Sequence, residues 1–327
     1  MTDDFSYLNA RIKIRRSQLL NEGFFHEALR LSFSELVKVL GETIYGQDLT
    51  GNTLADVDHA ISVHLSRTLT DLPRLVSGEA REAVRLVLLR SDLKNIKLIL
   101  RSKRAGKPPD EIARILGGGT LPRSLYGALT EAPDAAAMAQ VLSFPGHPLA
   151  RALREACATT REPIELEIEL DRAFYAAMLR SARELDQPYL AHFVTALIDV
   201  LNLATGLKLH EMGLQIRLDR AFLQGGKTIH LPLFERLAQG DVAALEELGG
   251  TDFKMVAEVR DLARIEHQLR CVLLAEASEG ARDALGAGIA VDYVQKKEWE
   301  AARLRLLARR ANYGLPASSV EQEVFCQ

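Results

Sequence analysis

Aromatic side chains and cysteines are both scarce in this chain of 327 residues. Aromatic residues make up 6% of it, with a single tryptophan, Trp299. The three cysteines, Cys157, Cys271 and Cys326, are odd in number and far apart in the sequence. This excludes a small disulfide framework and favours free thiols in a reducing compartment. The net charge of −3 excludes an overall basic field that would attract nucleic acid or an anionic lipid surface.

Long hydrophobic runs are also missing. Residues 1–20 contain acidic residues and several arginines rather than the apolar core of a signal peptide. A membrane-spanning helix requires about 18 consecutive apolar residues, and the best segment, residues 193–209, is interrupted by Asp199, Asn202 and Lys208. We therefore expect a chain that does not cross a membrane, although it can lie on one.

No complete catalytic, metal-binding or nucleotide-binding motif is present. The tetrapeptide at 225–228, Gly-Gly-Lys-Thr, resembles the end of a phosphate-binding loop, but Ala221 stands where the motif requires its first glycine. No two histidines have the i, i+4 spacing of a metal-binding helix. No serine lies in a nucleophile elbow. We therefore predict a glycine turn at 225–228, with no catalytic residue, no cofactor, no metal and no direct nucleotide binding.

The periodicity that is present is helical. Leu86, Leu89, Leu93, Ile96 and Leu100 fall three and four residues apart, which is typical of the apolar face of a helix. Strand-like alternation occurs at 164–170, Ile-Glu-Leu-Glu-Ile-Glu-Leu. Because glutamate favours helix and the segment continues into a helical pattern, we predict helix there as well. The predicted fold class is all-α.

One sequence pattern occurs three times, about a hundred residues apart. Each copy has an acid, a polar or basic residue three positions later, an aliphatic residue next, and a base nine or ten positions after the acid. The acid and its partner are Asp92 and Asn95, Asp199 and Asn202, and, in a more divergent copy, Glu300 and Arg303. A second pattern recurs in step with the first, at residues 40–45, 142–145 and 248–253. We infer three similar units, at residues 1–115, 116–222 and 223–327.

The repeated acids favour a structural role over a catalytic one. An acid and its partner at i, i+3 share one helix face. Catalysis would require carboxylates that converge on one site, whereas the repeat places them in separate units. A buried carboxylate is costly unless it is paired. We therefore expect Asp199, which apolar residues surround, to form hydrogen bonds near Asn202 or on the adjoining helix.

The densest basic group lies near the C-terminus and consists of Arg303, Arg305, Arg309 and Arg310. Glutamates flank it, and it lacks the interleaved aromatics of a nucleic-acid-binding surface. Two interpretations stay open. The arginines belong to a solvated helix with internal ion pairs, or Arg305, Arg309 and Arg310 form an interface whose guanidinium groups bind carboxylates of a partner protein.

Several short motifs in a fixed order resemble one known family. They are Tyr-Leu-Asn-Ala-Arg at 7–11, Glu-Thr-Ile-Tyr-Gly at 42–46, Asp-Leu-Lys-Asn-Ile at 92–96, and the segment 299–310 followed by Tyr-Gly-Leu-Pro at 313–316. In order, spacing and total length the chain resembles the C subunit of bacterial and archaeal V-type ATP synthases, the counterpart of the d subunit of the eukaryotic V-ATPase. Local departures are Pro-Gly-His at 145–147, where the other copies have threonine and an aromatic, and the acid and base of the third copy.

The resemblance implies a pseudo-threefold funnel of three helical units around a central cavity. It implies a non-catalytic central-rotor subunit, peripheral on the cytoplasmic face of the cell membrane. The implied role is to couple the membrane rotor ring of proteolipid subunits to the central-shaft subunits, so that proton or other ion translocation drives ATP synthesis, or the reverse. The implied protein is a monomer in isolation, occurs once per complex, and binds no nucleic acid.

Two other functions stay open from the sequence. The first is a helical-repeat adaptor unrelated to rotary ATPases, which would bind a peptide on a concave face of an open solenoid. The second is an all-α enzyme with a small-molecule pocket of converging ionisable groups, which a stabilising substrate would reveal.

Overall fold

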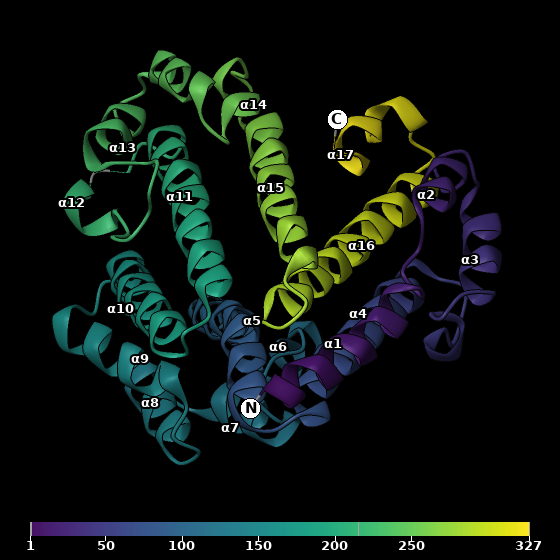
Figure 1. Cartoon of the computed structure of the whole chain (residues 1–327), viewed down its shortest axis with the longest axis horizontal. Helices are drawn as coiled ribbons and strands as arrows, with labels where there is room; N and C mark the ends of the chain where they lie inside the picture. Colours follow the sequence, from purple (N-terminus) through teal and green to yellow (C-terminus); the bar gives the residue numbers. More distant parts are fainter. Residues whose placement is uncertain (1, 215, 327) are drawn as a thin grey trace. The chain divides into compact units, whose positions relative to one another are not determined.

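The computed structural model describes residues 2–214 and 216–326, and every regular element in those two ranges is helical (Figure 1). The all-α prediction is therefore confirmed. The chain divides into two compact units, the first formed by Met1–Val84 with Ala277–Gln327 and the second by Arg85–Glu276. The division into three units at 1–115, 116–222 and 223–327 and the pseudo-threefold funnel stay predictions.

The first unit combines the two ends of the chain around one long helix, α16 (Gly288–Asn312). Helix α16 lies alongside α1 (Thr2–Arg16) and α4 (Leu54–Asp71) (Figure 1). The remaining elements are α2 (Glu22–Ala28), α3 (Phe33–Gly41), α17 (Glu321–Val324) and the short 3-10 helices η1 (Gly46–Asp48), η2 (Leu72–Leu75), η4 (Gly280–Arg282) and η5 (Ala317–Ser319). Leu304 and Leu307 of α16 pack with Phe25, Leu36 and Ile61 in one buried core.

The second unit contains α6 (Pro109–Ile115), α7 (Arg123–Glu131), α8 (Ala135–Ser143), α9 (Pro148–Thr159), α10 (Pro163–Glu184), α11 (Pro188–Glu211), α12 (Leu218–Ala221), α13 (Leu231–Ala238), η3 (Val242–Gly250) and α14 (Lys254–Ala257). Most of α5 (Gly78–Arg104) and α15 (Leu262–Glu279) also belongs to it. Its buried core includes Leu203 and Leu207 of α11, Phe234 of α13 and Leu269 of α15.

The alternating segment at 164–170 is the first part of α10, so the prediction of helix there is confirmed. Pro163 occupies the first turn, where its missing N–H has no intrahelical acceptor to lose. Leu166, Leu170 and Phe174 are buried at intervals of four residues. The segment therefore follows the helical period, and its strand-like appearance comes from glutamates at positions that do not belong to that buried face.

Helix α11 is the one helix in the described residues that is long and apolar enough to cross a membrane. More than half of its most apolar window, 56%, is buried inside the protein. Asp199 and Asn202 lie in the middle of the helix and are themselves buried. The apolar composition of α11 is therefore explained by its position in the core of the second unit. Such a composition is common for the central helix of a folded domain.

The three helices that carry the repeated acids end in the same way. Gly106, Gly213 and Gly314 have φ values of 71°, 60° and 65°, and each follows the acid of its copy by fourteen residues. In each case the next residue donates its N–H to the carbonyl five residues earlier, which is the Schellman ending of a helix. These glycines are a third marker of the repeat, beside the acids and the leucine pattern.

The helix endings lead to a prediction about stability. Replacing Gly314 by alanine places a side chain at φ 65°, which costs about 1–2 kcal/mol of unfolding free energy. The matched control is Gly127→Ala in the interior of α7, where a new Cβ has no neighbour within 4 Å. This control is expected to raise stability by up to about 1 kcal/mol. Thermal unfolding of both variants tests the difference, and an equal or higher melting temperature for Gly314→Ala contradicts it.

Candidate functional site

The repeated acids form three clusters of buried polar contacts, which we call interlocks. Interlock 1 is built on α5. Asp92 is fully buried and accepts hydrogen bonds from the Thr120 N–H at 2.9 Å, from the Thr120 hydroxyl at 2.6 Å and from the Tyr126 hydroxyl at 2.6 Å. Asn95 donates to the Gly117 carbonyl at 2.9 Å and accepts from the Gly117 N–H at 3.0 Å. The two side chains of α5 thereby fix the loop at 117–120.

Interlock 2 repeats this arrangement on α11. Asp199 accepts three backbone N–H groups, from Lys227, Thr228 and Ile229, each at 2.9 Å. Asn202 exchanges two hydrogen bonds of 2.8 Å with the backbone of Leu223. The predicted role of Asp199 as a buried, paired structural carboxylate therefore agrees with its contacts, although its partners are a loop rather than Asn202 or a helix.

The tetrapeptide that resembles a phosphate-binding loop is part of interlock 2. It forms a turn, as predicted, between α12 and α13. Successive backbone N–H groups in such a turn can surround an anion. Here the N–H groups of Lys227 and Thr228 point at the Asp199 carboxylate of the same chain. The resemblance to a phosphate loop thus has a physical basis, and the anion is internal.

Two glycines allow the loops to approach the carboxylates. A Cβ on Gly119 would lie 1.9 Å from an Asp92 oxygen, and a Cβ on Gly226 would lie 2.2 Å from an Asp199 oxygen. Both glycines follow their acid by twenty-seven residues. Only a residue without a side chain can bring the backbone this close. The equal spacing is therefore a signal in the sequence that these two glycines have the same role. A search for known motifs does not detect it.

Interlock 3, on α16, uses different chemistry. Glu300 accepts one backbone N–H, from Leu20 at 2.6 Å, and the Tyr45 hydroxyl at 2.7 Å. The buried Lys297 ammonium lies 2.5 Å from the same carboxylate. Burial lowers the pKa of Lys297, and Glu300 opposes that shift. Burial also raises the pKa of Tyr45, and the neighbouring Glu300 raises it further.

Arg303 takes the place that asparagine has in the other two copies. Its guanidinium contacts both carboxylate oxygens of Glu22, at 2.8 and 2.9 Å, instead of a backbone peptide. It also stacks over the ring of Phe25, 3.6 Å from the ring centre. Burial lowers the pKa of Arg303, and the bond to Glu22 works in the opposite direction. The third copy therefore holds its loop, at 20–22, through ion pairs as well as a backbone contact.

The second repeated pattern, which begins with a leucine in each copy, supplies one further residue to each interlock. This residue lies five positions after the leucine. Tyr45 donates to Glu300, and His147 Nε2 lies 3.2 Å from Asp92. Phe253 lines a small cavity that Asp199 also lines. In the second copy, where the sequence Pro-Gly-His at 145–147 departs from the pattern, this residue is a histidine. In the other two copies it is an aromatic residue whose N–H donates to the hydroxyl of a threonine two positions earlier.

The base nine positions after each acid also has an equivalent partner. Arg101 contacts Glu167 on α10, Lys208 contacts Glu266 on α15, and Arg309 contacts Asp58 on α4. The three bases are about half exposed, so these ion pairs add little stability. Their value is positional: α5 is joined to α10, α11 to α15 and α16 to α4. In the sequence, α10 comes before α11, α15 before α16, and α4 before α5. The first copy therefore contacts the helix before the second, the second contacts the helix before the third, and the third contacts the helix before the first, so the order of contacts is cyclic.

The predicted partner interface is placed as follows. Arg310 is buried and donates to the backbone carbonyls of Ala28 and Leu31. Arg305 donates to the Ser62 hydroxyl at 2.9 Å, and burial lowers its pKa. Arg309 is 48% exposed beside Asp58. Arg303 and Arg309 thus form ion pairs within the chain, as one of the two interpretations predicts. A partner interface at these arginines stays a prediction.

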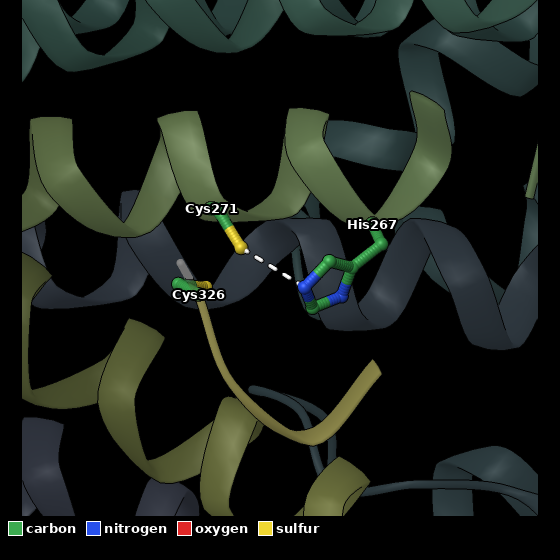
Figure 2. Close-up of side chains that lie close together, drawn as sticks. All are labelled: His267, Cys271 and Cys326. Atoms are coloured by element: carbon green, nitrogen blue, oxygen red, sulfur yellow. Dashed lines mark hydrogen bonds between the residues drawn. The ribbon is translucent and has the colours of Figure 1, made fainter. Parts of the chain in front are cut away.

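The three cysteines occur in two chemical states. Cys157 on α9 is a free thiol, as predicted, whereas Cys271 and Cys326 are disulfide-bonded, so the prediction of free thiols is wrong for these two. Cys271 Sγ lies 3.4 Å from His267 Nε2, one turn away on α15 (Figure 2). This i, i+4 pair joins a histidine to a cysteine, so a search for pairs of histidines does not find it. Because Cys271 is disulfide-bonded, its sulfur is no thiolate and offers no metal ligand in this state.

Comparison with known proteins now adds to this geometry. Residues 8–323 match the family model of the ATP synthase (C/AC39) subunit. The chain belongs to this family. The match leaves out only the two ends of the chain, so the repeated acids, their loops and their helix endings all lie within the part that defines the family.

Relatives extend over the whole chain. The C subunit of the V-type ATP synthase of Thermus thermophilus is 49% identical, with all of both chains covered. The protein of the same name from Deinococcus radiodurans is 29% identical over 99% of this chain and 92% of its own. The C subunit of the A-type ATP synthase of Halorubrum lacusprofundi is 26% identical over 97% of this chain and 96% of its own. The predicted resemblance is confirmed, and a protein of this family is an accessory structural component of the complex rather than the catalytic one.

Interlock 2 gives a second stability prediction. Gly226→Ala forces the loop away from Asp199 and weakens three hydrogen bonds to a buried charge, which are each worth about 1.5–3 kcal/mol. We expect a loss of at least about 3 kcal/mol in unfolding free energy. The control Gly249→Ala has no atom within 4 Å of the new Cβ and is expected to change stability little. Equal melting temperatures for the two variants contradict the proposed close approach.

A third prediction concerns pH. His64 is buried against the ring of Tyr45, with ring centres 4.6 Å apart. Burial lowers the pKa of His64 from 6.5 to about 4, with Lys297 and Arg67 adding to the shift and Asp48 opposing it. Between these two pKa values the unfolded chain binds a proton that the folded chain does not. The unfolding free energy therefore falls as pH drops from 6.5 towards 4, by up to about 3 kcal/mol.

The measurement is the difference in unfolding free energy between pH 7 and pH 4.5 for two variants. His64→Gln removes the titrating group, so its stability is expected to depend less on pH than that of the unmodified chain. The control His59→Gln alters an exposed histidine five residues away on α4. An identical pH dependence in His64→Gln and the unmodified chain contradicts the assignment.

Proposed function

We propose that this chain is a non-catalytic central-rotor subunit of a rotary V-type ATP synthase or ATPase. In this role it couples the membrane rotor ring of proteolipid subunits to the central-shaft subunits. Ion translocation then drives ATP synthesis, or ATP hydrolysis drives translocation. The observation that carries the proposal is the full-length similarity to proteins named as the C subunit of V-type and A-type ATP synthases.

The interlocks support a mechanical role. Apolar contacts between helices are non-directional, so they resist sliding less well than contacts with fixed geometry. A buried carboxylate held by several hydrogen-bond donors has one favourable position, and displacing the loop leaves a charge unpaired in the interior. Three such interlocks, on α5, α11 and α16, make each long helix and the loop beside it move together. A protein that transmits torque requires this property.

The proposed setting is the cytoplasmic face of the cell membrane, where the chain is peripheral and present in one copy per complex. In isolation it is proposed to be a monomer. The pseudo-threefold funnel belongs to the same proposal, and the cyclic order of contacts made by α5, α11 and α16 supports it. Arg305 and Arg309 are proposed to face carboxylates of a partner protein in the complex, because Arg309 is half exposed and arginine binds carboxylates through two parallel N–H groups.

The proposal predicts the composition and behaviour of the assembled complex. Affinity purification through a tag on this chain, in mild detergent, is expected to yield the rotor ring and the shaft subunits together. Membranes from cells that lack the chain are expected to retain ATP hydrolysis by the catalytic part but to lose ATP-driven ion pumping. Re-addition of the purified chain is expected to restore pumping.

The control for re-addition is a chain with an exposed surface change remote from the interlocks, such as Arg74→Glu. It is expected to restore pumping as the unmodified chain does. Pumping that persists without the chain, or purification with neither the ring nor the shaft, would overturn the proposed coupling role.

A further inference from the structure

A solvent-open groove runs along α10 in the second unit. It consists of two hollows of about 580 and 350 Å³, both of which are lined by Ala176 and Gln224. The walls combine small or aliphatic side chains, among them Ala156, Ala173, Ala176, Leu179 and Leu223, with charged ones. None of the interlock acids lines the groove, but Leu223 and Gly225, which belong to the loop of interlock 2, form part of its wall.

The two ends of the groove differ in charge. At the end nearer the start of α10, the charged groups are paired: Arg172 and Arg220 both contact Glu169, at 3.1 and 3.0 Å, and Glu155 contacts Arg151. At the other end, Arg180 and Arg183 are exposed, and no ion pair or hydrogen bond of their side chains occurs within the described residues. Glu184 shares that end, which leaves an excess of one positive charge.

We propose that this groove binds an acidic amphipathic helix of another protein, aligned antiparallel to α10. Small alanines on the wall allow the backbone of a helix to approach closely, and an apolar stripe on the partner would pack over Ala173 and Ala176, which remain accessible. Carboxylates in the first turn of the partner would meet Arg180 and Arg183, whose planar guanidinium groups suit carboxylate oxygens.

The direction follows from electrostatics. Acidic residues stabilise the N-terminal turn of a helix, where the helix dipole is positive. The unpaired arginines lie near the C-terminal end of α10, which carries the negative end of its own dipole. A partner that begins with its acidic turn at Arg183 and runs towards Arg172 therefore places opposite charges and opposite dipole ends together.

The shape of the groove argues against a small free anion as the occupant. Both hollows are open to solvent, so a small anion near Arg180 and Arg183 would keep most of its hydration and gain little from two exposed guanidinium groups. A helix instead covers the length of the groove and removes from water the part of its wall that is still exposed, such as Ala176. The inference does not depend on the rotor role, because it concerns a different surface.

Photo-cross-linking in the assembled complex tests the proposal. A photoreactive amino acid at Gln224, which is exposed and lines both hollows, is placed in the full chain, and the complex is purified and irradiated. The expected product joins Gln224 to a helical segment of another protein of the complex that carries acidic residues at its N-terminal end. Mass spectrometry identifies the segment and its direction along α10.

Three variants complete the experiment. Arg180→Glu with Arg183→Glu is expected to lower the cross-link yield by about tenfold or more, since like charges would then face each other. Ala176→Trp is expected to do the same by filling the groove. The matched control, Arg123→Glu with Arg161→Glu, reverses two other exposed arginines and is expected to leave the yield unchanged.

Other results overturn the proposal. These are cross-links only within the chain or to lipid, a partner segment without acidic residues, a segment that runs parallel to α10, or a yield that charge reversal does not change. Each of them leaves co-purification with the ring and shaft unaffected, so failure here is distinguishable from failure of the rotor proposal. Unchanged melting temperatures of the surface variants show that any loss of cross-linking is local.

Discussion

The arrangement of the helices depends on buried carboxylates that backbone N–H groups hold in place. Asp92 and Asp199 are 0% and 2% exposed, and an unpaired charge at such a site is strongly destabilising. The loops at 117–120 and 223–229 remove this cost only when they lie within hydrogen-bonding distance. Each loop leads directly into the next group of helices, so the position of one side chain on α5 or α11 determines where the following part of the chain can pack.

The third copy meets the same constraint with different groups. Glu300 has one methylene more than aspartate and receives one backbone N–H, as Asp92 does, whereas Asp199 receives three. The other donors to Glu300 are the Tyr45 hydroxyl and Lys297, whose burial lowers its pKa. Arg303 then binds a side chain, Glu22, instead of a peptide group. All three copies therefore share a buried carboxylate whose charge is stabilised by hydrogen-bond donors. The donors differ between the copies: they are backbone N–H groups, hydroxyl groups or an ammonium group.

Much of the fold and part of the site could be predicted from the sequence. Helical periodicity predicted the all-α class, and the triplicate acid located three of the structurally decisive side chains. The base nine residues later is visible in the sequence, but its partners on α10, α15 and α4 are not, because an exposed ion pair leaves no separate pattern in the sequence. Gly119 and Gly226 are not predictable for a related reason: apart from their equal spacing from the acids, a single sequence does not distinguish a glycine that completes a turn from one that admits a carboxylate.

The helices, their spacing and their glycine endings follow from the local sequence, because they depend on contacts between residues a few positions apart. The loop that each carboxylate binds depends instead on how distant parts of the chain pack together. For Asp199 that loop lies more than twenty residues further along the chain, and for Glu300 it lies near the N-terminus, at Leu20. Such pairings follow from the path of the whole chain. They turn a repeated acid, ambiguous in the sequence, into the contact that holds each long helix to its neighbours.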